Sequence, residues 1–374
     1  MNNTKFRSSV VSQKNFSINF YAKLANAFFA LRNHCKNIDN TSIKVDCANG
    51  IGVAAINSFN DHCLANNLSE TPVFTPINDA SNGELNSLCG ADFVKTKQKF
   101  PAGDFSETDT RFAAFDGDAD RILYFYNDAN SGFRLLDGDK IAALMAKQLN
   151  DWLKEAGLEK VNLGVVQTAY ANGASTSFLN QNVGQEKVSC AKTGVKHLHA
   201  RAHMFDIGVY FEANGHGTVT FKPEVEEKIR QSGHEKLIHF VDLINQTVGD
   251  AFSLLLCVEI CLAFNNMSVK DWASMYCELP NRLCKVLVED RTKIVTFDEE
   301  RKVSEPKGLQ EAIDKTVAEF ENGRSFVRPS GTEDAVRVYA EAATQKQCDE
   351  LATKVARLVH ELDGGKGELP KNIF

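Results

Sequence analysis

The chain has 374 residues, of which 43% are hydrophobic and 24% are charged, and its formal net charge is −7. This length predicts two or three domains, and the acidic balance argues against a nucleic-acid binder or a membrane-surface protein. The 10 cysteines form no Cys-x-x-Cys pair and no zinc-site spacing, so we expect reduced thiols and a cytoplasmic location. The most apolar run, residues 251–264, is too short to cross a membrane and carries Glu259, so it is predicted to be a buried helix.

The N-terminal region divides into two parts. Residues 1–18 show no periodicity and are predicted to be irregular. No acidic residue precedes Asp39, and this composition resembles a transit peptide. The alternative, which we favour, is an amphipathic helix from about residue 20 packed on the protein, because Leu24 and Phe28 recur at helical spacing with apolar neighbours.

Beyond this helix, short apolar runs alternate with segments of helical spacing. Strands are predicted at residues 42–47, near 73, and at 112–115, 123–126, 133–136, 161–167, 188–190, 207–211, 284–288, 325–327 and 335–342. Helices are predicted after residue 52, at 137–156, around 221–263, at about 307–320 and at 345–362. Residues 90–110 are predicted to be polar and irregular. The alternation predicts an α/β fold, in which ligands bind at the carboxyl ends of strands.

Three carboxylates follow the apolar run 112–115 at alternate positions: Asp116, Asp118 and Asp120. Without a counter-ion they would repel one another, and hard oxygen ligands of this kind suit Mg²⁺. The alternative is a solvated acidic turn. A calcium-binding EF-hand loop is excluded, because Arg121 occupies the sixth position where that loop needs glycine. We call residues 116–121 the metal loop, after the ligand that they are predicted to bind.

A second motif lies near the C-terminus, where an apolar strand leads into groups that suit a phosphate. It combines two arginines, two hydroxyl groups and free backbone N–H groups, which together form a phosphate cradle. Its residues are Arg328, Pro329, Ser330, Gly331, Thr332 and Arg337. The alternative is a Pro-Ser-Gly turn with two surface arginines. We call residues 328–334 the phosphate loop.

Two further polar motifs follow strands in the middle of the chain. Glu212, Ala213 and Asn214 place hydrogen-bonding side chains at alternate positions, which suits the vicinal hydroxyl groups of a sugar. We call residues 212–216 the sugar loop. Lys196 and His197 are candidates for a general base or a phosphate contact, and the alternative is that they are packed residues at the start of a helix.

Together the motifs resemble the α-D-phosphohexomutase family. Asp-Gly-Asp-Ala-Asp-Arg at 116–121, Glu-Ala-Asn-Gly at 212–215 and Arg-Pro-Ser-Gly-Thr-Glu at 328–333 occur in that family's order. They are most similar to the branch that acts on N-acetylglucosamine phosphates, because other branches typically have Ser at the position of Asn214. The resemblance runs from about residue 20 to the C-terminus. It implies two α/β sheet domains of the phosphohexomutase type, followed by a smaller α+β phosphate-binding domain, with boundaries at 1–18, 19–136, 137–268 and 269–374.

The resemblance also implies a function. Asp116, Asp118 and Asp120 would hold Mg²⁺, and the sugar and phosphate loops would hold a hexosamine phosphate. The reaction implied is the interconversion of N-acetylglucosamine 6-phosphate and N-acetylglucosamine 1-phosphate, on the way to UDP-N-acetylglucosamine. Lys196 or His197 would then lie near the acid/base chemistry. Nothing in the motifs indicates an oligomeric state.

The sequence departs from the family at one motif. The family's first domain carries a Thr-Ala-Ser-His-Asn-Pro loop with the phosphoserine, and here no serine before Asp116 is followed by His-Asn-Pro. We therefore expect a truncated mutase that lacks its nucleophile and is inactive alone. One alternative is a non-catalytic sugar-phosphate binding protein derived from the mutase. Another is a phosphatase with an aspartyl nucleophile, which is disfavoured because such enzymes need Thr or Val where this chain has Asp120.

Overall fold

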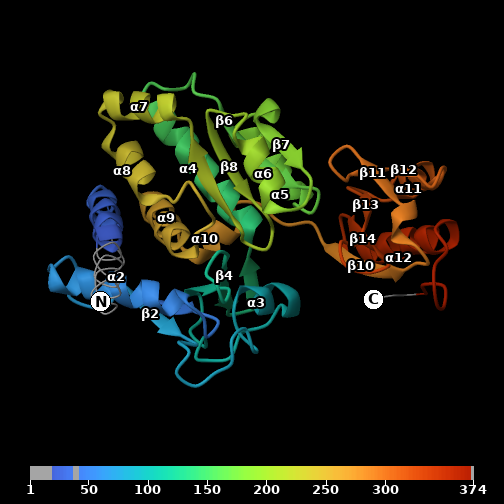
Figure 1. Cartoon of the computed structure of the whole chain (residues 1–374), viewed down its shortest axis with the longest axis horizontal. Coiled ribbons are helices and arrows are strands. Elements are labelled where there is room, and N and C mark those ends of the chain that lie inside the picture. The colour runs from blue at the N-terminus through green and yellow to red at the C-terminus, as the bar shows by residue number, and fades with distance from the viewer. Residues whose placement is uncertain (1–18, 37–41, 372–374) are drawn as a thin grey trace, which may run out of the picture.

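The computed structural model describes residues 19–36 and 42–371 (Figure 1). The segment predicted to be irregular, residues 1–18, lies outside this range. Residues 19–32 are helical, and Leu24 and Phe28 are buried, as the amphipathic pattern predicts. The α/β prediction is confirmed, because helices pack on several sheets that contain parallel and antiparallel strands.

The first sheet has five strands in the order β2-β1-β3-β4-β5. Its strands are β1 (Ile43–Asp46), β2 (Phe74–Ile77), β3 (Arg111–Phe115), β4 (Ile122–Asp128) and β5 (Gly132–Leu136), with helices α2 (Gly52–Ala65) and α3 (Ala91–Lys97). Strand β1 runs parallel to β2 and β3, so the loops after β1 and β3 emerge at the same edge. The metal loop is the turn between β3 and β4, which pair antiparallel.

The prediction that residues 90–110 are irregular is wrong at helix α3. This helix has seven residues and follows Gly90, whose φ of 85° suits glycine. Ala91 and Val94 are buried in a small cluster with Phe105 and Phe112. Two buried positions in a single short helix are too few to show a helical period, so tertiary packing rather than periodicity defines this element.

The second sheet, which we call the sugar-loop sheet, has four strands in the order β7-β6-β8-β9. Its strands are β6 (Leu163–Thr168), β7 (Val188–Ala191), β8 (Ile207–Phe211) and β9 (Gly217–Phe221). Its helices are α4 (Gly138–Glu155), α5 (Gly173–Asn182), the 3₁₀ turn η1 (Gln185–Lys187), α6 (Val195–Ala202), α7 (Pro223–Ser232), α8 (Glu235–Leu243), α9 (Ala251–Phe264) and α10 (Val269–Ala273). Strand β9 was not predicted, and it makes the sugar loop the turn of an antiparallel β8–β9 hairpin.

One hydrophobic core joins these two sheets. Helix α9, predicted to be buried, is covered on all sides between them, and Glu259 within it pairs with Arg111 of β3 at 2.6 Å. The Tyr124 hydroxyl also donates to Glu259, at 3.0 Å. Among the described residues, no helix is long and apolar enough to cross a membrane. The predicted boundary near residue 136 therefore lies within a continuous core, and the domain boundaries remain a prediction.

Residues 281–362 form what we call the C-terminal lobe, which lies beside the sugar-loop sheet in Figure 1. Its elements are β10 (Asn281–Leu287), the 3₁₀ turn η2 (Arg291–Lys293), β11 (Val295–Phe297), β12 (Lys302–Glu305), α11 (Leu309–Val317), β13 (Arg324–Pro329), β14 (Ala335–Glu341) and α12 (Gln345–Leu362). Strands β10, β14 and β13 form one antiparallel sheet with its own hydrophobic core. The small β11–β12 hairpin was not predicted from the sequence.

Candidate functional site

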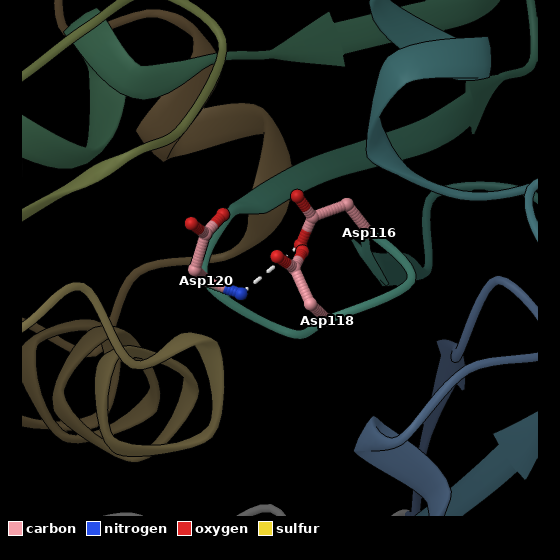
Figure 2. Close-up of side chains that lie close together, drawn as sticks. All are labelled: Asp116, Asp118 and Asp120. Carbon is pink, nitrogen blue, oxygen red and sulfur yellow. Dashed lines mark hydrogen bonds between the residues drawn. The ribbon is translucent and has the colours of Figure 1, made fainter.

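The metal loop brings its three carboxylates together (Figure 2). Asp116, Asp118 and Asp120 each offer an oxygen atom, and these atoms all lie within 4.8 Å of one another. The Asp116 side chain is buried at the end of β3, Asp120 is half-buried, and Asp118 is exposed to solvent. A cluster that is closed on one side and open on the other can hold a cation and leave room for a further ligand.

The backbone of the loop is folded around Asp116. Its Oδ1 atom accepts hydrogen bonds from the backbone N–H groups of Asp120, at 3.0 Å, and Arg121, at 3.1 Å. Burial raises the pKa of the Asp116 carboxyl to about 7, and the neighbouring charges of Asp120 and Asp118 add to the rise. A bound cation would offset both effects.

Two observations test whether this loop fits Mg²⁺. The donors are all carboxylate oxygens, which is the hard ligand type that this ion prefers. The Oδ1 atom of Asp120 is buried and has no hydrogen-bond partner in the described part of the chain. The Arg121 guanidinium compensates only partly, since its Nε lies 3.5 Å from Asp116 and 3.6 Å from Asp120 while its Nη1 pairs with Asp92 at 2.8 Å. The loop therefore fits Mg²⁺.

The sugar loop is a tight turn held by its own hydrogen bonds. The backbone N–H of Glu212 donates to the His216 carbonyl at 2.9 Å, which closes the β8–β9 hairpin. The Asn214 side chain donates to the Glu212 carboxylate at 3.3 Å and accepts from the His216 N–H at 3.1 Å. Glu212, Ala213 and Asn214 are half-buried, so their polar atoms are fixed but within reach of a ligand.

The structure places the sugar loop against the metal loop. Arg121 and His216 form an isolated antiparallel bridge, and the Ile122 N–H donates to the Gly215 carbonyl at 3.3 Å. Gly215 has a φ of 91°, and a Cβ there would lie 2.1 Å from the Ile122 carbonyl oxygen. The Nδ1 atom of His216 lies 3.3 Å from a carboxylate oxygen of Asp120, so this histidine links the two loops.

Lys196 and His197 lie near the sugar loop, but in the described part of the chain no polar contacts hold their side chains in place. Both are exposed in the first turn of α6, just after Gly194, whose N–H donates to Glu212 at 2.9 Å. Among the described residues, neither side chain makes a hydrogen bond. The side chain of His199, two residues further on, contacts the Tyr210 hydroxyl at 2.9 Å. The start of α6 thus lies beside the sugar loop, and a chemical role for Lys196 or His197 remains a prediction.

The phosphate loop consists of the last two residues of β13 and the turn that leads into β14. The Ser330 N–H donates to the Ala335 carbonyl at 2.8 Å, and Ser330 is buried while Gly331 and Thr332 are exposed. Arg337 pairs with Glu333 of the same loop at 3.3 Å. The exposed backbone of the turn can therefore contact an anion directly.

Glu300, which no sequence motif indicates, connects the phosphate loop to the rest of the site. This residue lies in the β11–β12 turn, and its Oε1 is 3.8 Å from Nε of Arg328. Its Oε2 accepts from the N–H of Thr193 at 3.0 Å and from the Thr193 hydroxyl at 2.8 Å. Since the next residue, Gly194, binds Glu212, a continuous series of polar contacts runs from the phosphate loop to the metal loop.

Comparisons with known proteins agree with this arrangement. The domain II model of the family described as "Phosphoacetylglucosamine mutase AMG1" matches residues 7–123, and the domain III model matches residues 137–267. The "Phosphoglucomutase/phosphomannomutase, C-terminal domain" model matches residues 283–358. The phosphoacetylglucosamine mutase of Homo sapiens is 50% identical over 367 residues, which cover 95% of this chain and 66% of the human protein. Phosphoacetylglucosamine mutase 1 of Schizosaccharomyces pombe is 44% identical, over 91% of this chain and 67% of its own length.

This chain belongs to the phosphoacetylglucosamine mutase family. A solved structure supports the assignment: the Aspergillus fumigatus N-acetylphosphoglucosamine mutase in complex with GlcNAc-6P and magnesium superposes with a TM-score of 0.85 at 45% identity. The superposition covers 91% of this chain and 69% of the Aspergillus protein. The chain spans 66% of the length of the human relative.

Proposed function

We propose that this chain provides the magnesium, sugar and phosphate sites of a phosphoacetylglucosamine mutase, for the interconversion of N-acetylglucosamine 6-phosphate and 1-phosphate. The observation that carries the proposal is the clustering of three carboxylates directly beside the sugar loop, bridged by His216 to Asp120. A solved relative is a complex with this sugar phosphate and magnesium, which supports the same ligands here. The product would serve UDP-N-acetylglucosamine synthesis.

Each loop has a proposed role. Asp116, Asp118 and Asp120 hold Mg²⁺, which neutralises charge that develops on a transferring phosphoryl group. Glu212 accepts hydrogen bonds from the sugar, and Asn214 can both donate and accept them. The hairpin turn fixes the orientation of both side chains. The phosphate that does not react is held by the side chains and backbone of the phosphate loop, namely Arg328, Ser330, Gly331, Thr332 and Arg337. Lys196 or His197 at the start of α6 is the proposed proton donor or acceptor.

Binding of the sugar phosphate and transfer of its phosphoryl group depend on different parts of a mutase. Resemblance to the family implies that a phosphoserine donates its phosphoryl group to one sugar hydroxyl and then takes back the other phosphoryl group. The 374 residues contain no serine before Asp116 followed by His-Asn-Pro. We propose that these residues alone bind sugar phosphate weakly and lack a covalent route for transfer. The alternative function is a sugar-phosphate binding protein without catalysis.

A coupled assay for N-acetylglucosamine 1-phosphate tests the proposal, using the 374-residue chain with Mg²⁺ and a sugar bisphosphate. We expect no sustained turnover by the chain alone. A fusion to an upstream domain with a Thr-Ala-Ser-His-Asn-Pro loop should restore turnover, and Asp118→Asn in that fusion should abolish it again. If the chain alone turns over, another residue serves as nucleophile. If the fusion binds the sugar phosphate but stays inactive, the binding function is favoured.

We also propose a cellular location and a class of binding partner. All 10 cysteines are free in the structure, which supports a reducing compartment such as the cytoplasm. The net charge of −7 supports a small-molecule substrate rather than a nucleic-acid partner.

A further inference from the structure

Glu300 lies in a turn whose backbone is unusual. Asp298, Glu299 and Glu300 have φ angles of 52°, 54° and 67°, so three consecutive non-glycine residues adopt the left-handed conformation. Each such residue costs free energy relative to the ordinary helical or extended conformation, and the surrounding contacts must offset this cost. The turn is thus held in a shape that carries the Glu300 carboxylate out of the C-terminal lobe.

The Glu300 carboxylate binds the start of α6 as a phosphate oxygen would. It accepts hydrogen bonds from both the N–H and the hydroxyl of Thr193, at 3.0 and 2.8 Å. The following N–H, on Gly194, is occupied by Glu212 at 2.9 Å. Two carboxylates of the chain itself therefore occupy consecutive backbone donors, one from the C-terminal lobe and one from the sugar loop.

Glu300 makes weaker contacts with Arg328 than with Thr193. The Nε of Arg328 lies 3.8 Å from the Glu300 carboxylate, which is close enough for an ion pair but too far for a hydrogen bond. The same Nε atom is buried and has no hydrogen-bond partner among the described residues. The guanidinium also lies over the Tyr170 ring, 5.8 Å from its centroid. A phosphate group could give Arg328 the hydrogen bonds that Glu300 does not.

We propose that Glu300 is an internal anion that latches the C-terminal lobe onto the sugar-loop sheet, and that a bound phosphate monoester displaces it from Arg328 and thereby releases it from Thr193. This inference rests on the proposed role of Arg328 in phosphate binding. Thr193 is followed by Gly194, whose N–H donates to Glu212. Release of Glu300 from Thr193 should therefore also affect the position of the sugar loop. Linkage requires the effect to be mutual: phosphate weakens the latch as much as the latch weakens phosphate binding.

The first test is calorimetric titration of inorganic phosphate into the 374-residue chain. Glu300→Gln removes the competing charge and should tighten phosphate binding by roughly three- to tenfold. Glu299→Gln is the matched control, because its carboxylate lies in the same turn and makes none of these contacts; it should bind phosphate like the wild type. Unchanged or weaker binding by Glu300→Gln would overturn the latch.

The second test is hydrogen exchange at the Thr193 amide, which does not depend on turnover. Saturating phosphate should speed exchange of this amide in the wild type by releasing Glu300. In Glu300→Ala the exchange should be fast with and without phosphate. If phosphate slows exchange in the wild type, the anion adds to the Glu300 contact instead of displacing it, and the latch is wrong.

Arg328→Ala separates the latch from the proposed function. If this variant binds phosphate like the wild type, the phosphate loop is not the site and the proposed function fails at that point. If Arg328→Ala binds phosphate weakly while Glu300→Gln binds it like the wild type, the phosphate site stands and only the latch fails. A fall in melting temperature for Glu300→Gln without tighter phosphate binding would show that Glu300 is purely structural.

Discussion

The C-terminal lobe meets the sugar-loop sheet at two junctions that are built differently. At the first, Arg324 binds Glu341 through two hydrogen bonds, at 2.8 and 3.1 Å. The same guanidinium donates to the carbonyl groups of Ala169 and Ala171, at 2.8 and 2.6 Å, and the Gly173 N–H donates to Glu341 at 3.1 Å. The Glu341 side chain is 2% exposed and the Arg324 side chain is 33% exposed, so it is the carboxylate whose charge is satisfied away from water.

At the second junction the partners are matched less completely. Glu300 binds Thr193 through two hydrogen bonds, but its distance to Arg328 is 3.8 Å. The side chain of Glu300 is 16% exposed and that of Arg328 is 19% exposed. An ion pair whose carboxylate is buried and fully bonded acts as a fixed joint, because breaking it leaves that charge without compensation. A pair that is incompletely bonded, and whose carboxylate is more exposed, can exchange partners. The comparison therefore separates a permanent attachment of the lobe from one that a ligand can replace.

The largest effect is expected at the fixed junction. Glu341→Ala removes the buried carboxylate that bonds Arg324 and the Gly173 N–H, and should lower the free energy of unfolding by about 3 kcal/mol, the low end for a buried pair because Arg324 is 33% exposed. Urea denaturation measures this loss. Glu319→Ala is the control, because Glu319 is 52% exposed in its pair with Lys354 and should cost less than about 1 kcal/mol. Equal losses in the two variants would mean that the buried junction holds the lobe no more firmly than a surface pair.

A second effect is expected at the exchangeable junction. Arg328→Ala should weaken binding of N-acetylglucosamine 6-phosphate by roughly ten- to a hundredfold, because a charge-assisted hydrogen bond to the phosphate is lost. Titration calorimetry measures the affinity, and circular dichroism should show an unchanged fold. Arg230→Ala is the matched control, since this arginine pairs with Asp242 on α8, outside the C-terminal lobe, is 45% exposed and should leave binding unchanged. An equal loss in both variants would point to nonspecific charge effects.

The smallest effect is expected further along the series of contacts, at the sugar loop. Asn214→Ser shortens the side chain that now donates to Glu212 and accepts from the His216 N–H. The preference for N-acetylglucosamine 6-phosphate over glucose 6-phosphate should fall roughly two- to tenfold, the range of one neutral hydrogen bond. Competition binding with both sugars gives the ratio. If the ratio does not change, the acetamido group is recognised away from Asn214.

The sequence was most informative where function depends on neighbouring residues. The metal loop is specified by alternate positions after an apolar strand, and Asp116, Asp118 and Asp120 lie together in the structure. Glu300 could not be found in this way, because 107 residues separate it from Thr193 and its turn has no motif. The junction of Arg324 with Ala169 spans 155 residues and likewise has no local signature.

The same distinction applies to secondary structure. The long periodic helix α12 (345–362) agrees with the approximate range predicted for it, since many turns repeat one pattern. Short elements such as α3, β9 and β11 were missed, because their conformation depends on tertiary contacts with segments far along the chain. Local patterns therefore predicted the loops that carry charge, but not the junctions that bring those loops together.

The central claim is that the metal, sugar and phosphate loops form one binding site, and paramagnetic relaxation tests it most directly. Mn²⁺, which accepts the same oxygen ligands as Mg²⁺, would be added to the chain with N-acetylglucosamine 6-phosphate in excess. We expect Mn²⁺ to speed relaxation of the sugar's acetyl protons strongly in the wild type. Asp118→Asn should reduce the effect by weakening metal binding, and Arg328→Ala should reduce it by weakening sugar-phosphate binding. A strong enhancement that persists in Arg328→Ala, or none in the wild type with both ligands bound, would contradict a single site.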